Sequence, residues 1–137
     1  MDRLDRELLE RLRRNARMPF VKMAEELGVS EGTIRSRVRK LETMGVIRRF
    51  TVITDFKDGV EAVVNVKTST SAATRNLADA ISQMENVDFT FEIMGETDIL
   101  TLVKAASTAD LDNRIEDIRK LPGVENTTSS LILRKYY

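Results

Sequence analysis

The side chains best suited to chemistry with a polyanion are concentrated between residues 30 and 48. Four cations stand within six residues, at Arg35, Arg37, Arg39 and Lys40, and short hydroxyl side chains lie among and before them. A guanidinium can donate two parallel hydrogen bonds to guanine or to a phosphate, and a hydroxyl can bond a base edge or the backbone. The pattern predicts a DNA contact through ten residues: Ser30, Glu31, Gly32, Thr33, Arg35, Ser36, Arg37, Arg39, Lys40 and Arg48.

We assign the cations two kinds of partner. Arg35 and Arg39 are expected to reach base edges in the major groove, and Arg37, Lys40 and Arg48 are expected to contact phosphates. A plainer interpretation stays open, because an exposed helix often carries solvated Lys and Arg, and i, i+4 charge pairs account for some of them.

Two short helices joined by a tight corner are predicted around these residues. Pro19 suits the first turn of a helix, after which apolar residues recur at three- and four-residue spacing. Gly28 can adopt the left-handed conformation that ends a helix, and Ser30 is a good N-cap for the next one. The second helix has an apolar stripe at i, i+4, i+7 spacing: Ile34, Val38 and Leu41. This is the pattern of a helix-turn-helix, whose second helix enters the major groove.

A third helix is predicted over residues 2–16, where Leu4, Leu8, Leu9, Leu12 and Ala16 form one apolar face. It would complete a three-helix core. After Gly45, the β-branched run Val46–Ile53 predicts a strand leaving this unit, a wing or linker strand on which Arg48 and Arg49 can touch the DNA backbone. The alternative is that these two arginines are a solvated pair on the strand.

The net charge of the chain is zero, but the charge is unevenly distributed. Residues 1–50 contain 13 Lys and Arg against 8 Asp and Glu, whereas residues 51–137 contain 9 against 14. The two parts therefore carry +5 and −5, which indicates that only the first meets a polyanion.

Several classes of protein are disfavoured by composition. The chain has no Cys and no His, so disulfides, thiol nucleophiles, histidine bases and the usual zinc and haem ligands are absent. We find no paired-carboxylate or glycine-rich phosphate motif, and we expect neither an enzyme nor a cofactor. There is no apolar run of membrane-spanning length and no signal-peptide pattern, so we expect a cytoplasmic protein.

The second part of the chain has the periodicities of an α+β domain. Alternation predicts strands at 60–67, 87–93, 99–105 and 124–135, and helical spacing predicts helices at 72–84 and 108–120. The two halves match at an offset of 37 residues, as in Ile81 and Ile118. The order βαββαβ indicates a ferredoxin-like sheet with both helices on one face. We therefore predict domains at 1–50 and 60–137, joined by a linker at 51–59.

The bare face of such a sheet needs a cover. In strand 99–105, Ile99, Thr101 and Val103 lie on one side and Leu100 and Leu102 on the other. A strand that is apolar on both sides is normally covered on both sides. We expect a second copy of the domain to provide this cover, giving a homodimer. The alternative is a half-solvated sheet that tolerates two exposed leucines.

The two domains in this order resemble the Lrp/AsnC family, the feast/famine transcription regulators of bacteria and archaea. The resemblance spans the chain and is strongest in the following segments: Leu4–Leu9, Val29–Val38, Leu41–Glu42, Gly45–Ile47, Met94–Leu100 and Leu121–Thr127. It implies a regulator-of-amino-acid-metabolism (RAM) domain that dimerises through its sheet and assembles further, commonly to octamers. The connector at 54–59 looks shorter than is usual in the family.

The resemblance also implies a small effector, usually an amino acid, bound in the cleft between dimers. The family's Gly-x-x-Asp turn maps onto Gly95, Glu96, Thr97 and Asp98, and Thr127 and Thr128 would add hydroxyls from a neighbouring subunit. Such a site can offer N–H donors to a carboxylate and acceptors to an ammonium. An alternative is that Gly95 and Asp98 merely build a hairpin turn.

The resemblance thus predicts a sequence-specific DNA-binding transcription regulator modulated by an amino-acid-like effector. A low-specificity architectural DNA-binding protein without a ligand is the alternative, because it shares the basic first domain and the oligomer.

Overall fold

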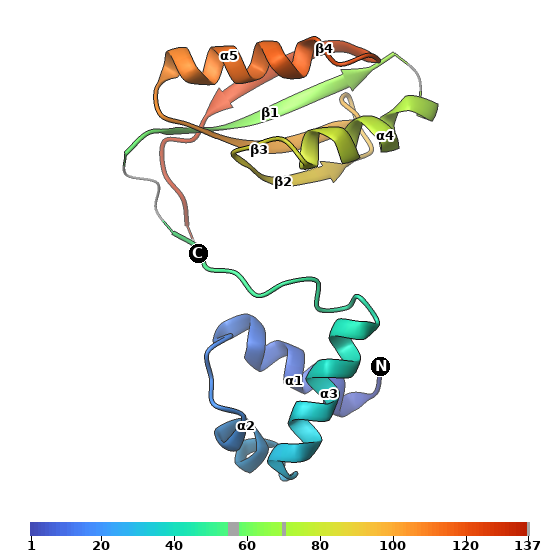
Figure 1. Cartoon of the computed structure of the whole chain (residues 1–137), viewed down its shortest axis with the longest axis vertical. Helices are drawn as coiled ribbons and strands as arrows, with labels where there is room; N and C mark the ends of the chain where they lie inside the picture. The colour runs from blue at the N-terminus through green and yellow to red at the C-terminus, as the bar shows by residue number, and fades with distance from the viewer. Residues whose placement is uncertain (55–57, 70, 137) are drawn as a thin grey trace. The chain divides into compact units, whose positions relative to one another are not determined.

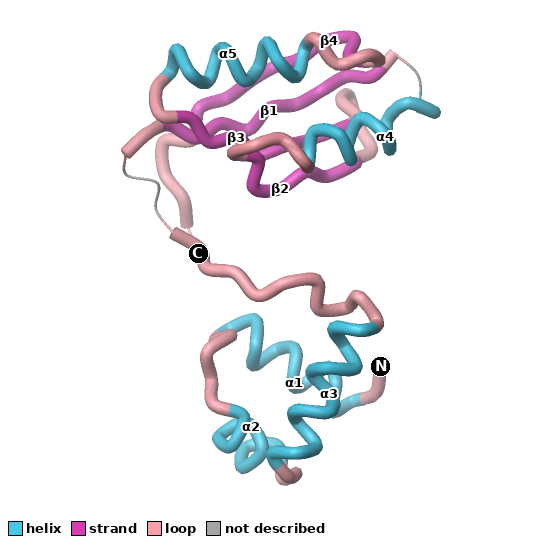
Figure 2. Tube along the Cα trace, in the orientation of Figure 1, coloured by secondary structure: helices cyan, strands magenta, loops and turns pink. Residues whose placement is uncertain are grey.

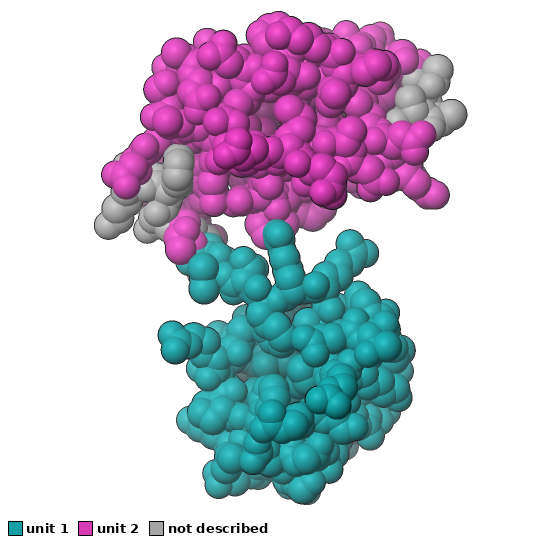
Figure 3. Space-filling model, in the orientation of Figure 1, with its two compact units in different colours: residues 1–53 teal, residues 54–137 magenta. Residues whose placement is uncertain are grey.

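The computed structural model of the chain describes residues 1–54, 58–69 and 71–136, with the side chains of 71–73 left aside. The chain divides into two compact units, Met1–Ile53 and Thr54–Tyr137, coloured separately in Figure 3. The division falls inside the linker predicted at 51–59, of which 55–57 lie outside the described residues. Among the helices described, none is long and apolar enough to cross a membrane.

The N-terminal unit is a bundle of three helices (Figure 1): α1 (Arg3–Arg14), α2 (Phe20–Leu27) and α3 (Glu31–Thr43). Its core consists of the apolar stripes predicted for each helix, namely Leu8, Leu12, Met23, Ala24, Ile34, Val38 and Leu41. The prediction of a three-helix core is confirmed. The first helix is shorter than predicted, since it ends at Arg14 and leaves Ala16 exposed.

The corner between α2 and α3 has the caps predicted from the sequence. Gly28 ends α2 with φ +65°, a left-handed conformation that glycine adopts without steric cost. Ser30 begins α3, and its hydroxyl accepts a hydrogen bond from the backbone N–H of Thr33 at 3.1 Å. Together these caps fix the direction in which α3 leaves the corner.

The strand predicted at Val46–Ile53 is not present. Residues 48–54 are irregular, and Val52 and Ile53 are 76% and 70% exposed. β-Branched residues favour an extended backbone, but a strand also needs a partner to accept and donate its hydrogen bonds. None of the described strands pairs with this segment, so the prediction of a strand here was wrong for the single chain.

The C-terminal unit has the predicted order βαββαβ. Its elements are β1 (Val60–Thr68), α4 (Ser71–Ser82), β2 (Val87–Glu92), β3 (Ile99–Ala105), α5 (Thr108–Arg119) and β4 (Val124–Leu131). The strands form one antiparallel sheet in the order β2-β3-β1-β4, and α4 and α5 lie on the same face (Figure 2). The ferredoxin-like fold predicted from the sequence is confirmed.

The helix-covered face of the sheet contains the core of this unit. Ala62, Val64 and Val66 of β1 pack with Ile99 and Val103 of β3 and with the apolar sides of both helices. Along β3 the residues alternate between buried and half-buried, which matches the alternation in the sequence. Leu100 and Leu102 thus lie on the face that no helix covers.

The internal repeat extends to the backbone. In the first half, Asn86 has φ +66° just after the backbone N–H of Met84 bonds the carbonyl oxygen of Ile81 at 3.0 Å. In the second half, 37 residues on, Gly123 has φ +96° after the N–H of Leu121 bonds Ile118 at 3.1 Å. Each helix therefore returns to the sheet through the same kind of left-handed turn.

Strand β4 ends four residues before the predicted Lys135. The N–H of Ile132 still donates to the carbonyl oxygen of Glu61 at 2.8 Å. Its neighbour β1 begins at Val60, which the register places opposite residue 133, so residues beyond Leu133 have no strand opposite them. The apolar alternation in the sequence does not reveal this limit.

Candidate nucleic-acid interface and effector turn

One side of α3 is buried and the other is exposed and basic. Ile34, Val38 and Leu41 are at most 5% exposed, so the opposite side of the helix faces solvent. The exposed members of the predicted DNA contact are Ser30, Gly32, Arg35, Ser36, Arg39, Lys40 and Arg48, while Glu31, Thr33 and Arg37 are half-buried.

Gly32 leaves open space on this surface. Its φ is ordinary, and a Cβ there would meet only the Ser30 hydroxyl oxygen, at 3.8 Å. Packing within the chain therefore does not require glycine at this position. A missing side chain in the first turn of α3 allows another molecule to approach the backbone closely.

The two hydroxyls at the start of α3 are engaged with each other. The Ser30 and Thr33 side-chain oxygens lie 2.9 Å apart, and the Ser30 oxygen also caps the helix. Ser36 lies further along the exposed side. Of the three predicted hydroxyl contacts, Ser36 is thus the one outside this cap.

Arg35 is held in place by two neighbours. Its Nη2 donates to the carboxylate of Glu31 at 2.5 Å, and its guanidinium carbon lies 5.4 Å from the centre of the Phe20 ring. Phe20 is the first residue of α2, so the side chain of Arg35 bridges the two helices of the corner. Helical spacing after Pro19 places Phe20 on the apolar face of its helix and does not indicate this contact with Arg35.

Arg37 turns away from the exposed side toward α1. Its Nη1 donates to the Asp5 carboxylate at 2.9 Å and also to the carboxylate of Asp2. Asp2 and Asp5 form the capping box at the start of α1, each accepting from the backbone N–H of the other at 2.9 Å. This geometry argues against the phosphate contact predicted for Arg37, because the chain itself occupies its guanidinium.

The hydrogen bonds in this cluster lower the pKa of both of its carboxyl groups. The hydrogen bond from Arg37, followed by the backbone N–H of Asp5, lowers the pKa of Asp2 to about 2. The pKa of Asp5 is also lowered, chiefly by the backbone N–H of Asp2 and then by Arg37. Asp5 is only 2% exposed, so its negative charge depends on these donors.

Arg39 and Lys40 keep their charges available. Both are exposed on α3, and within the described residues neither forms an ion pair. Arg48 is exposed in the irregular segment that follows the helix. These side chains are the unengaged cations of the predicted interface.

The predicted effector turn, Gly95 to Asp98, connects β2 to β3. The Asp98 carboxylate accepts from the backbone N–H of Thr68 at 2.8 Å and from its hydroxyl at 3.1 Å. The ammonium of Lys67 lies 3.4 Å away. The pKa of Asp98 is lowered, mainly by the backbone N–H of Thr68. Asp98 therefore ties the turn to the end of β1, while Gly95 and Glu96 remain exposed and Thr97 is half-buried.

Thr127 and Thr128 point to opposite faces of the sheet. Thr127 is 7% exposed, pairs with the buried Val66, and its hydroxyl accepts from Nε of Arg119 at 2.7 Å. Thr128 pairs with Asn65 and is exposed. Because Val66 also pairs with Ile99, this pair of threonines and the 95–98 turn lie at the same end of the sheet, on either side of β1.

Both units match known sequence families. The AsnC-type helix-turn-helix domain matches residues 1–42, and the Lrp/AsnC ligand binding domain matches residues 61–137. The chain belongs to the Lrp/AsnC family. Its members are transcription regulators rather than enzymes, as predicted.

Similar Lrp/AsnC proteins cover the whole chain. The HTH-type transcriptional regulator LysM of Sulfurisphaera tokodaii is 39% identical over 137 residues, covering 100% of this chain and 98% of that protein. LysM of Saccharolobus solfataricus is 34% identical, covering 100% and 96%. The structure of a feast or famine regulatory protein from M. tuberculosis, complexed with L-methionine, matches with a TM-score of 0.83 at 26% identity, covering 99% and 94%.

The uncovered face of the Lrp/AsnC ligand-binding domain carries an apolar cluster. The strand register pairs Phe91 with Leu100, and both Phe89 and Val63 with Leu102, so these five side chains share that face. The rings of Phe89 and Phe91 stack at 6.2 Å between centres and are 44% and 49% exposed. We call these five residues the open-face cluster.

An ionic group borders the open-face cluster at one end. The ammonium of Lys104 lies 2.6 Å from the Asp88 carboxylate and 3.9 Å from that of Glu61. Lys135 donates to Glu61 at 2.6 Å, and Glu61 is 8% exposed. These four charged side chains thus lie together at one end of the open-face cluster.

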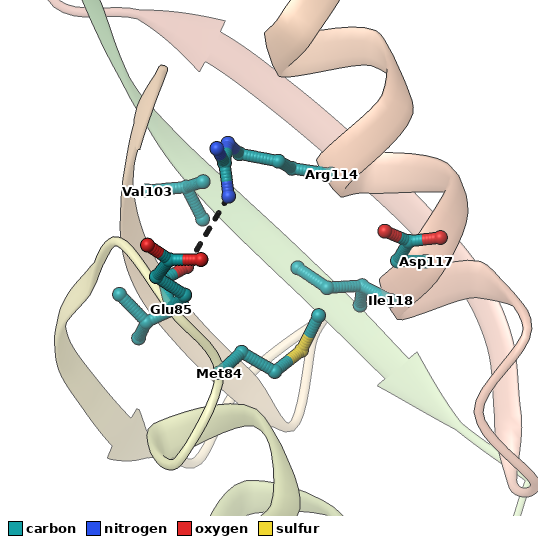
Figure 4. Close-up of a pocket in the computed structure, with 7 residues that line it drawn as sticks. Met84, Glu85, Val103, Arg114, Asp117 and Ile118 are labelled. Carbon is teal, nitrogen blue, oxygen red and sulfur yellow. Dashed lines mark hydrogen bonds between the residues drawn. The ribbon is translucent and has the colours of Figure 1, made fainter.

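A cleft of about 250 Å³ opens on the helix-bearing side of the domain, between α5 and the turn that leads into β2 (Figure 4). Met84, Val103 and Ile118 line it, with Arg114 at its edge. Arg114 donates to the Asp110 carboxylate at 3.2 Å and to the carbonyl oxygen of Glu85 at 3.5 Å. The described lining of this cleft includes none of the six predicted effector residues.

Proposed function

We propose that this Lrp/AsnC regulator binds specific duplex DNA through the exposed side of α3 and changes its DNA affinity when an amino acid binds its C-terminal unit. The observation that carries the DNA part is the division of α3 into a buried apolar side and an exposed side with unengaged cations. Such a helix can enter the major groove without disturbing the core that holds it.

The contact set that we propose differs from the predicted one in a single residue. Arg35 and Arg39 would reach base edges, and Lys40 and Arg48 would contact phosphates. Arg37 is left out because its guanidinium is bound to Asp2 and Asp5. The remaining contacts are the small or polar groups of the first turns: Ser30, Glu31, Gly32, Thr33 and Ser36.

We propose that two copies pair through the open-face cluster. Five apolar side chains on one uncovered sheet face form a continuous surface of the kind that marks an interface. A dimer would present two α3 helices to half-sites about 34 Å apart, or a multiple of that distance. Assembly to a tetramer or octamer would build on this dimer.

For the effector we propose the exposed part of the 95–98 turn together with Thr128. Gly95 and Glu96 are exposed and can offer a backbone N–H and a carboxylate to a zwitterion. Asp98 would hold the turn, and Thr127 would support β4, because both side chains already have partners in the chain. An amino-acid effector is supported by the relative that was crystallised with L-methionine.

The test is a selection from random duplex DNA, combined with a thermal-shift screen of the twenty amino acids and native mass spectrometry. A defined sequence motif with a melting shift for one or a few amino acids would support the regulator. DNA binding without a motif and without any ligand shift would favour the alternative, an architectural DNA-binding protein.

The proposed transcription regulator would act in the cytoplasm, where the DNA is.

A further inference from the structure

Arg35 differs from the other exposed cations of α3 in having a fixed position. One side of its guanidinium is bonded to Glu31, and one face lies over the Phe20 ring. The first contact comes from its own helix and the second from α2. A cation over an aromatic ring is attracted by the ring's negative face, so Phe20 acts as a platform for this group.

The carboxylate of Glu31 also changes what Arg35 can do electrostatically. At 2.5 Å the two opposite charges form an ion pair with no net charge. A phosphate gains most from an unpaired cation, whereas a base edge is neutral and requires donors that point in a fixed direction. The geometry therefore suits Arg35 to a base rather than to the DNA backbone.

Enough donors remain for such a contact. A guanidinium has five N–H groups, and the bond to Glu31 uses one of them. The side chain of Arg35 is 60% exposed, and Glu31 is the one hydrogen-bond partner of its guanidinium within the described residues, so the other donors stay available. Two of these donors can form the bidentate pair to O6 and N7 of guanine.

We infer that Phe20 is a positioning residue for base recognition: together with Glu31 it holds Arg35 in the orientation that reads guanine, without itself touching DNA. This inference rests on the proposed function, because it assumes that α3 enters the major groove. Phe20 is half-buried beside the core, and its ring packs against the guanidinium of Arg35.

The experiment starts with wild-type protein and a pool of duplexes carrying 20 random base pairs. Binding constants are then measured on the selected duplex and on copies in which each guanine in turn is replaced by adenine. We expect one guanine per half-site to be preferred by roughly 5- to 150-fold. Arg35→Lys should abolish that preference and leave the other positions unchanged, because lysine keeps the charge but lacks the planar fork.

Phe20→Leu tests the inference itself. In this variant the preference for that guanine should fall roughly two- to fivefold. In Phe20→Tyr, which keeps the ring, the preference should stay that of wild type. The slope of log K against log salt should stay unchanged in both variants, since no phosphate contact is lost. Lys40→Gln is the matched control, and it should lower the magnitude of the slope by about 0.9 while leaving the base preference intact.

Glu31→Gln provides a second variant that does not touch the core. It removes the negative charge that is paired with Arg35, so Arg35 becomes free to bind phosphates. Affinity for non-specific DNA should therefore rise, and the preference for guanine should fall. Equal guanine preference in wild type, Phe20→Leu and Glu31→Gln would overturn the inference. If wild-type protein selects no motif at all, the proposed function fails as well, and the two failures are thereby distinguished.

Discussion

The guanidinium of Arg37 lies 2.9 Å from the carboxylate of Asp5, a side chain that is buried at the start of the first helix of the chain. The contact joins α3 to the capping box of α1 across 32 positions of sequence. It fixes the helix that carries the proposed DNA contacts to α1, the remaining helix of the N-terminal unit.

Replacing Arg37 should affect stability rather than phosphate binding. In Arg37→Gln the Asp5 carboxylate would lose a charged donor while remaining buried, so the melting temperature should fall by about 5 °C or more. The salt dependence of DNA binding, measured on the folded variant at low temperature, should remain that of wild type.

Lys40→Gln is the control for this comparison and should give the opposite result. Its melting temperature should stay near that of wild type, and the slope of log K against log salt should shrink by about 0.9. A reduced slope for Arg37→Gln would show that its guanidinium does reach a phosphate.

Acid should weaken the same cluster over a defined pH range. The pKa of Asp2 is about 2 in the folded chain, against an ordinary value of 3.8. A lowered pKa means that the carboxylate contributes stability above pH 4, and that this contribution is lost as the pH falls from about 4 to about 2. The melting temperature of Asp2→Asn, measured at a series of pH values between 6 and 2, should therefore fall less steeply with decreasing pH than that of wild type. Asp112→Asn, on the exposed side of α5, should follow wild type.

Position 37 also illustrates what the sequence could and could not predict. Arg37 stands three residues after Ile34 and four before Leu41, so helical spacing already places it beside the buried stripe. The phosphate contact was predicted from the residue type of Arg37 alone. The caps at Gly28 and Ser30, the βαββαβ order and the placement of both helices on one face of the sheet depend on local pattern, and these were predicted correctly.

The failures came from partners that local pattern does not specify. Val46–Ile53 has strand-forming residues, but none of the described strands pairs with it, and β4 ends at Leu131, close to the point where its neighbour β1 begins. Asp98 and Thr127 each bond a group brought from elsewhere in the fold, Thr68 and Arg119, which the sequence pattern does not indicate, and their predicted contact with an effector stays a prediction. Such contacts are set by tertiary packing, which a single sequence does not display.

Gly95→Ala should separate effector binding from the structure of the turn. A Cβ at Gly95 would meet no atom within 4 Å, and its φ is not in the left-handed region, so the melting temperature should stay the same or rise slightly. If the backbone at Gly95 contacts the effector, the added methyl group should reduce the melting shift caused by the amino acid found in the screen.

Asp98→Asn is the matched comparison. It weakens the bonds to Thr68, so the melting temperature should fall even without a ligand. An undiminished ligand shift in Gly95→Ala would move the effector site away from this turn.

Arg39→Ala should distinguish a base contact from a phosphate contact. The side chain is exposed and forms no ion pair with the described residues, so its removal should leave stability almost unchanged. Binding to the selected duplex should weaken by roughly 5- to 150-fold, and binding to unrelated duplex much less. Equal losses on both duplexes in a gel-shift titration would make Arg39 a phosphate contact.

Leu102→Glu should break the proposed dimer while leaving the fold of the subunit intact. Leu102 lies at the centre of the open-face cluster, between Phe89 on β2 and Val63 on β1, and it is only half-buried in the single chain. A carboxylate there can reach water in the monomer. In the dimer it would be buried without a partner, and the dissociation constant should rise at least about 100-fold.

Ser129→Glu is the control, because Ser129 pairs with Val64 and points to the opposite side of the sheet. Sedimentation of Leu102→Glu as a dimer would show that the copies associate through another surface.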